Sequence, residues 1–130
     1  VPTPSPEEPK AEIVTYTYID LSNLNELSGG DSSFTLRILS RIVQRLPDAF
    51  EELDRDLAQK DYEAIRKLAH SLKSSSGYAG CEELKEAYQK IENLAGSKSE
   101  LQRLPALVAE SQRIGKEVLR ELNHMIATLS

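Results

Sequence analysis

The sequence predicts an all-α protein that folds as an antiparallel up-down-up-down four-helix bundle with a short additional N-terminal helix. Three observations support this prediction: four long segments place apolar residues at helical spacing, no segment alternates in the manner of a strand, and the connections between segments are short. Short connections favour antiparallel packing of helices that follow one another in the chain.

The composition fits one domain with a single core and excludes several classes of protein. A net charge of −5, with basic residues spread along the helices, argues against a general nucleic-acid binder. Cys81 is the only cysteine, which excludes an internal disulfide and argues against structural zinc. We expect no direct membrane contact, because no apolar run approaches the roughly 18 residues of a membrane span. These features fit a reduced, cytoplasmic setting, whether or not a parent protein is anchored in a membrane.

Residues 1–18 are predicted to form a proline-rich linker and an extended lead-in, and residues 19–130 the folded domain. Tyr16 to Ile19 are expected to lie extended against the bundle, and Asp20 to cap a short helix. The apolar residues of that helix are Leu21, Leu24 and Leu27. Because the chain begins with valine instead of methionine, we expect it to be part of a longer protein.

The first long helix is expected to follow a cap at Asp31. Its apolar face comprises Leu39, Ile42, Val43, Leu46, Phe50, Leu53 and Leu57. Pro47 lies within this pattern. Because proline removes one intrahelical hydrogen bond and crowds the preceding turn, we expect either a bend or two abutting helices there.

The second and third helices are expected to form a tight hairpin. Asp61 caps the second helix, which runs from Tyr62 to Ala79, and Gly80 suits the left-handed position after it. The third helix starts at Glu82 and is expected to close at Gly96. Its apolar face comprises Leu84, Ala87, Tyr88, Ile91, Leu94 and Ala95.

The last helix is expected to start near Ser97 and Glu100, which have the spacing of a capping box. It carries a seven-residue repeat formed by Leu101, Leu104, Val108, Ser111, Gly115, Val118, Leu122, Met125 and Leu129. Such a repeat can build a dimer, but the other helices need a partner for their own apolar faces. We therefore expect the repeat to pack within one chain and the isolated domain to be a monomer.

His70 is the candidate reactive residue, because it lies in the second helix but off its apolar face. At about 100° per residue, the imidazole points roughly 140° away from the face formed by Ile65, Leu68, Ala69 and Leu72. Its surface neighbours supply two cations, a hydroxyl and a residue without a side chain, namely Arg66, Lys73, Ser74 and Gly77. Such a patch can accept a phosphate and leave room for a docking protein.

Simpler interpretations of the same residues stay open. A surface histidine usually has no chemical role, and His124 offers an internal comparison, since it lies off its own apolar stripe without comparable neighbours. Cys81 stands near a helix start, where a thiol can be activated, but it fits better as a small core residue.

The segment around His70 resembles a known family. His70-x-Leu72-Lys73-x-Ser75-Ser76, followed by Gly80 and Leu84, is similar to the signature of histidine-containing phosphotransfer (Hpt) domains, the carriers of multistep phosphorelays. The resemblance covers roughly Ile19 to Leu129 and extends to Tyr18-Ile19-Asp20-Leu21, Asp61-Tyr62-Glu63-Ala64-Ile65 and Ile91-Glu92-Asn93-Leu94. Two positions depart from it, because Ser74 stands where the family usually has glycine and Cys81 where it has a small residue such as alanine.

The resemblance implies a phosphoryl carrier without kinase activity of its own. His70 would take a phosphoryl group from the aspartyl phosphate of one response-regulator receiver domain and pass it to the aspartate of another. Lys73 would stabilise the phosphoryl oxygens, and Glu92 would hold the second ring nitrogen. The docking surface for the receiver would comprise Arg66, Lys67, Ser74 and Gly77. We expect no cofactor in the domain, because the receiver supplies Mg²⁺ during transfer.

Three classes of function remain at this point. The first is the phosphotransfer module, either as the C-terminal part of a hybrid sensor histidine kinase, as the proline-rich linker favours, or as a free-standing shuttle. The second is the dimerisation helix pair of a histidine kinase, whose reactive histidine is usually followed by an acidic residue and soon by proline. His70-Ser71-Leu72-Lys73 lacks both. The third is a helical interaction or scaffold bundle in which His70 has no chemistry.

Overall fold

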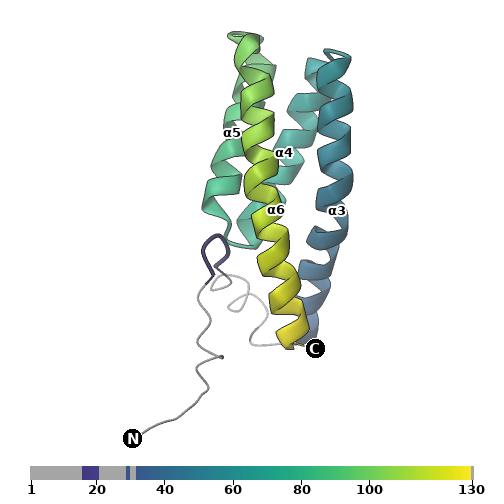
Figure 1. Cartoon of the computed structure of the whole chain (residues 1–130), viewed down its shortest axis with the longest axis vertical. Helices are drawn as coiled ribbons and strands as arrows, with labels where there is room; N and C mark the ends of the chain where they lie inside the picture. Colours follow the sequence, from purple (N-terminus) through teal and green to yellow (C-terminus); the bar gives the residue numbers. More distant parts are fainter. Residues whose placement is uncertain (1–15, 21–28, 30–31, 130) are drawn as a thin grey trace, which may run out of the picture.

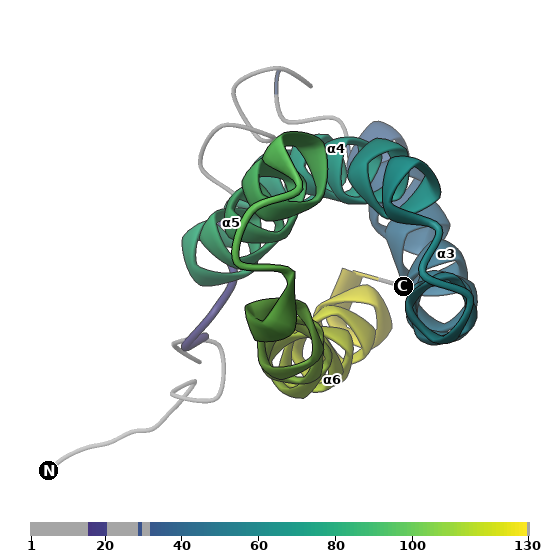
Figure 2. The same ribbon diagram turned by 90° about the horizontal axis from the view of Figure 1, so that it is seen from above.

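The computed structural model of the chain describes residues 16–20, 29 and 32–129, and within them the secondary structure is helical (Figure 1). Four helices, α3, α4, α5 and α6, span Ser32–Ala58, Tyr62–Tyr78, Glu82–Ser97 and Leu104–Leu129, and a short 3-10 turn, η2, spans Leu101–Arg103. Each helix runs antiparallel to the one before it, and the four stand in a ring in chain order when seen from above (Figure 2). The predicted antiparallel four-helix bundle is confirmed.

Some predictions at the N-terminal end fall outside the described residues. The short helix with Leu21, Leu24 and Leu27 lies there, and so does the cap at Asp31. Both stay predictions, as does the domain boundary between residues 18 and 19.

The bundle encloses one apolar core that draws on all four helices. Its largest fully buried side chains are Leu39, Leu53, Ile65, Leu72, Leu84, Tyr88, Ile91, Leu104, Val108, Val118 and Leu122. At Gly115 of α6 a Cβ atom would lie 2.6 Å from Cζ of Phe50, so the missing side chain lets α3 approach closely. The repeat positions from Leu104 to Leu122 are buried inside the bundle, as predicted. Within the described residues, none of the helices combines the length and apolar character that crossing a membrane requires.

Helix α3 continues through Pro47 as a single helix, so the expectation of two abutting helices is wrong. Pro47 is exposed, whereas Leu46 and Ala49 beside it are 3% and 0% exposed. A proline on the solvent side removes one backbone hydrogen bond but leaves the packing of the opposite side intact. The burial on that side keeps the helix whole.

The hairpin between α4 and α5 follows the prediction closely. The Asp61 side chain caps α4 by accepting a hydrogen bond from the Ala64 backbone N–H at 3.1 Å. The helix ends at Tyr78, one residue earlier than expected, and Gly80 has the left-handed φ of +67°. Cys81 is 1% exposed, and burial raises the pKa of its thiol to about 12, which confirms its interpretation as a core residue.

The connection from α5 to α6 differs from the prediction. Gly96 lies inside α5, which ends at Ser97, and Lys98 takes the left-handed position with φ of 55°. The side chain of Arg66 passes close to Gly96, where a Cβ atom would lie 3.2 Å from its Cδ. The capping box is also wrong, because Glu100 has a φ of 51° and precedes η2.

The segment Tyr16–Asp20, which we call the lead-in, lies against the bundle as predicted, although it bends at residues 17 and 18. The Glu121 carboxylate on α6 accepts hydrogen bonds from the backbone N–H groups of residues 17–19 at 2.9 to 3.2 Å. The Asp20 N–H donates to the carbonyl of Ala79 at 3.0 Å. The lead-in is thereby attached both to α6 and to the end of α4.

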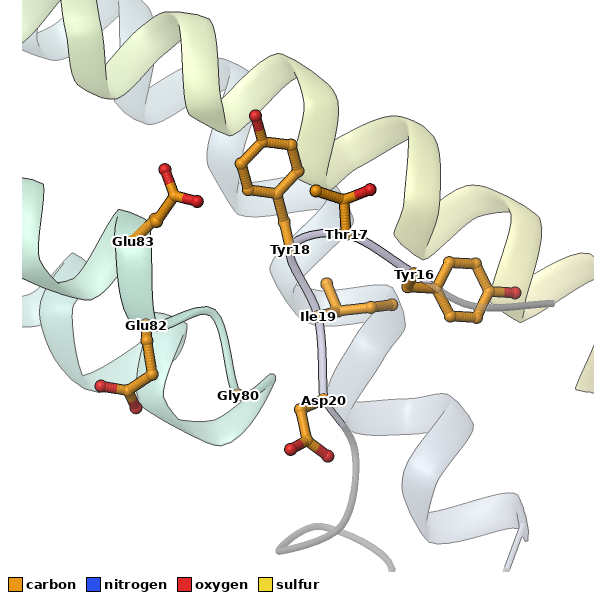
Figure 3. A pocket seen from close by; sticks show the side chains of 8 residues that line it. All are labelled: Tyr16, Thr17, Tyr18, Ile19, Asp20, Gly80, Glu82 and Glu83. Atoms are coloured by element: carbon orange, nitrogen blue, oxygen red, sulfur yellow. The ribbon is translucent and has the colours of Figure 1, made fainter.

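A pocket of about 430 Å³ lies between the lead-in and the start of α5, lined on the second side by Gly80, Glu82 and Glu83 (Figure 3). A Cβ atom at Gly80 would lie 1.9 Å from the carbonyl oxygen of Asp20. Position 80 therefore requires glycine for two reasons: its φ is positive, and the lead-in passes too close for a side chain.

Candidate functional site

His70 lies near the middle of α4 and presents its ring to solvent. Its side chain is 62% exposed, whereas Ala69 and Leu72 on the opposite face are 0% and 1% exposed. The buried face fixes the helix in the bundle, so the imidazole stands on a rigid support. The predicted exposure of His70 is confirmed.

Glu92 of α5 holds one nitrogen of this ring. Its Oε2 lies 2.9 Å from Nδ1 of His70, and the Glu92 side chain is 17% exposed. Because an ionised carboxylate only accepts hydrogen bonds, the contact requires the ring proton on Nδ1. In a neutral imidazole the lone pair is then on Nε2, the nitrogen free to act as a nucleophile.

Lys73 lies on the α5 side of His70, and its ammonium group is partnered. Nζ lies 2.9 Å from Oε1 of Glu92 and donates to Oε1 of Gln89 at 3.0 Å. The hydrogen bond from Lys73 and, to a smaller extent, that from His70 outweigh partial burial and hold the pKa of the Glu92 carboxyl below its ordinary value of 4.5. The structure thus brings His70, Lys73 and Glu92 into one network.

The other predicted cations are arranged differently. Arg66 donates to Oε1 of Glu63 on its own helix at 3.0 Å, so its guanidinium group is paired one turn away from His70. Lys67 is exposed on the same helix. Their charges lie near the site, but neither side chain belongs to the network of His70, Lys73 and Glu92.

Ser74 and Gly77 keep the surface beside His70 low. The Ser74 hydroxyl donates to the backbone carbonyl of His70 at 3.4 Å and so turns back toward the helix. A Cβ atom at Gly77 would meet only Cδ of Lys85, at 4.0 Å. Both positions leave space above the helix for a docking protein.

Two contributors were missed by the sequence reasoning. Gln89 accepts from Lys73 and donates from Nε2 to Oδ1 of Asn93 at 2.9 Å, which supports the lysine from α5. Gln89 lies one turn before Glu92 on the same helix, and this spacing could have predicted that both side chains face α4 near His70. Glu121, which holds the lead-in, had no such signal, because its backbone partners lie more than 100 residues away in the chain.

Within the described residues no group of three His, Cys, Asp or Glu side chains is placed to hold a metal ion. A four-helix bundle that presents an exposed histidine, oriented by a carboxylate from the next helix, has the arrangement expected of a phosphotransfer bundle. Residues 37–130 match the family model of the Hpt domain, and the chain belongs to this family. Hpt domains in general are phosphotransfer intermediates of phosphorelays and not kinases, and they interact with receiver domains.

The chain is 27% identical over 104 residues to the phosphorelay intermediate protein rdeA of Dictyostelium discoideum, an alignment that covers 80% of this chain and 41% of that protein. It therefore spans about two fifths of the length of that relative. Among solved structures, it is similar to histidine-containing phosphotransfer protein B (HptB) from Pseudomonas aeruginosa PAO1, with a TM-score of 0.79 and 24% identity over 88% of this chain and 98% of that one. This structural likeness shows the fold.

Proposed function

We propose that His70 is the residue of this chain that carries the phosphoryl group, taking it from the aspartyl phosphate of one receiver domain and giving it to the aspartate of another. The observation that supports this most is the exposed ring whose Nδ1 is held by Glu92, 2.9 Å away. That contact directs the nucleophilic lone pair to Nε2 before any donor arrives.

The transfer is an in-line displacement at phosphorus. Nε2 of His70 forms a bond to the phosphorus atom while the bond from phosphorus to the aspartate oxygen breaks, and the carboxylate leaves with the electron pair. The ring keeps its proton on Nδ1 and gains positive charge. Glu92 stabilises that charge, so its contribution is larger in the transition state than in the resting domain. The reverse sequence of steps delivers the group to the second receiver.

Lys73 contributes through position and charge. Its ammonium group holds Glu92 by the ion pair at 2.9 Å, and it lies one turn from His70, where it supplies a cation for the oxygens of an arriving phosphoryl group. We expect the receiver to supply the Mg²⁺ that neutralises the remaining charge. Arg66 and Lys67 add to the positive field, and Ser74 and Gly77 allow the receiver to approach.

The broader setting is also part of the proposal. The proline-rich composition of residues 1–18 supports a tethered domain at the C-terminal part of a hybrid sensor histidine kinase in the cytoplasm. The sequence of the full gene tests this proposal. A gene that encodes only this chain favours the free-standing shuttle.

The test of the central proposal uses a receiver labelled with radioactive phosphate and two variants with the same substitution. We expect the natural chain and His124→Gln to take up label, and His70→Gln to take up none. The label should be lost in acid and retained in alkali, as expected of a phosphoramidate bond. If His70→Gln takes up as much label as the natural chain, the domain is a scaffold or uses another residue, and the proposal is wrong.

A further inference from the structure

A second exposed feature stands on the same helix as His70. The Tyr78 side chain in the last turn of α4 is 54% exposed, and it is the large hydrophobic side chain that the described part of the chain leaves in solvent. Its ring contributes nothing to the core and none of the site contacts described above. Tyrosine combines a large apolar ring with a polar tip, and it is enriched where proteins bind one another.

The adjacent half of α3 is strongly basic. Between Ser32 and Leu46 the helix carries no acidic residue, and its charged side chains are Arg37, Arg41 and Arg45. The second half of the helix has the opposite character, with Asp48, Glu51, Glu52, Asp54 and Asp56. Arg45 is paired with Glu52 at 2.7 Å, and Arg37 lies over the ring of Phe34 at 5.9 Å. In a chain with a net charge of −5 this basic half is a local exception.

Helix geometry places Arg41 and Tyr78 at about the same level on the outside of two neighbouring helices. Helices α3 and α4 are antiparallel neighbours (Figures 1 and 2). Because Arg41 and Tyr78 lie at similar separations along the chain from the turn between Ala58 and Tyr62, they are at about the same level. Seen along the axis of α4, Tyr78 is rotated by about 80° from His70. Lys73, which faces α5, is rotated from His70 in the opposite direction. Tyr78 is therefore on the α3 side of the His70 face.

Arg41 lies on the matching side of α3. At about 100° per residue it is roughly 180° from Phe50. Phe50 packs against Gly115 of α6, so the opposite side of α3 is turned away from that helix. Arg41 is exposed there.

We propose that Tyr78 and Arg41 form a second docking point for the receiver domain and determine which receiver is bound. This proposal rests on the proposed function of His70. Tyr78 follows His70 by about 12 Å along the helix at 1.5 Å per residue. An interface of standard size covers about 800 Å² on each partner, so a receiver seated on His70 also reaches Tyr78.

The chemistry of the two side chains specifies the matching surface. The ring of Tyr78 fits an apolar surface on the receiver, and Arg41 fits an acidic side chain beside it. Tyrosine and arginine are among the residues that most often dominate the binding energy of an interface. A receiver without an acidic side chain at this point would leave Arg41 unpaired in the docked complex. Such a receiver should bind more weakly, so Arg41 and Tyr78 discriminate between receivers.

The test compares two phosphoryl donors on Tyr78→Ala and Arg41→Glu. With a phosphorylated cognate receiver, we expect kcat/KM for transfer to fall about tenfold or more for each variant. With phosphoramidate, a small donor that needs no docking surface, labelling of His70 should be unchanged. Tyr78→Phe should keep the rate, since it keeps the ring. Lys116→Glu makes the same charge change on α6, the helix diagonal to α4, and should also keep the rate.

Several outcomes overturn the docking proposal. Unchanged transfer by Tyr78→Ala and Arg41→Glu does so, and so does an equal loss in Lys116→Glu, which marks a general charge effect. A large fall in the midpoint temperature of thermal unfolding of Tyr78→Ala would show that the ring packs within the chain. A change in self-association of either variant would show that Tyr78 and Arg41 contact a second copy of the chain. If neither donor labels His70, the proposed function fails and the docking proposal falls with it.

Discussion

The two histidines of this chain are both exposed and both use Nδ1 for a hydrogen bond, yet their partners differ. Nδ1 of His70 contacts a carboxylate oxygen of Glu92 at 2.9 Å, whereas Nδ1 of His124 contacts the hydroxyl of Tyr16 at 2.7 Å. A carboxylate stabilises a ring that gains positive charge, and a hydroxyl does so far less. Both rings are exposed, so exposure does not separate them. The group that contacts Nδ1 therefore distinguishes the candidate nucleophile, His70, from the structural histidine, His124.

The surroundings extend this difference to two regions of the molecule. His124 stands one turn from Glu121, and together they attach the lead-in to α6 through Tyr16 and the backbone of residues 17–19. His70 contacts Glu92 of α5 and holds no part of the lead-in. We therefore expect changes around the lead-in to act mainly on stability and to leave transfer intact, and changes to the groups that contact His70 to act mainly on transfer.

The largest effect on stability is expected at Gly80, where the lead-in crosses the end of α4. Gly80→Ala forces a Cβ atom into a position 1.9 Å from the Asp20 carbonyl oxygen at a φ of +67°. We expect a loss of about 3 kcal/mol in the free energy of unfolding, measured with urea. Gly77→Ala on the His70 face is the control and should gain about 0.5 to 1 kcal/mol, because a helical glycine gives way to alanine in open space. Equal stabilities of the two variants would contradict this difference between the regions.

The next effect is expected at Glu92. Glu92→Gln removes the charge beside Nδ1 of His70 and breaks the ion pair with Lys73. We expect the transfer rate from a phosphorylated receiver to fall about tenfold, similar to the loss found when a carboxylate that orients a metal-binding histidine is removed. Glu121→Gln serves as the control from the lead-in region and should transfer at the natural rate. If both variants transfer equally, Glu92 has no special part in the reaction.

The smallest effect concerns acid. Because its contacts lower the pKa of Glu92 in the folded chain, this carboxylate contributes stability that is present above its ordinary value of 4.5 and is lost as the pH falls through the lower folded value. The natural chain should therefore lose more unfolding free energy on acidification below about pH 4.5 than Glu92→Gln does. Parallel pH profiles of the two proteins would show that the ion pair adds nothing to stability.

The local parts of the fold were predictable because their causes are local. Asp61 and Gly80 flank α4 with a cap and a left-handed residue, and periodic apolar spacing identified the buried face of that helix. The same reasoning failed at Gly96 and Lys98. A glycine can stay inside a helix at a modest cost when neighbouring helices pack over it, and a lysine can adopt the left-handed conformation.

The site was predictable only in part. The position of His70 off the apolar face followed from the helical period, and the pairing with Glu92 followed from resemblance to the Hpt family. The attachment of Lys73 to Glu92 and Gln89 needed the relative rotation of α4 and α5, which sequence spacing does not give. Glu121 was beyond reach for the same reason, since its contacts join the two ends of the domain.

The central claim is that Glu92 directs the reactive lone pair of His70 to Nε2. The most direct measurement is nuclear magnetic resonance of the phosphorylated domain with nitrogen-15 in its histidine rings, which identifies the nitrogen bonded to phosphorus. We predict a phosphorus-bound Nε2 on His70 and an unmodified ring at His124. Phosphorus on Nδ1 of His70, or on His124, would contradict the account.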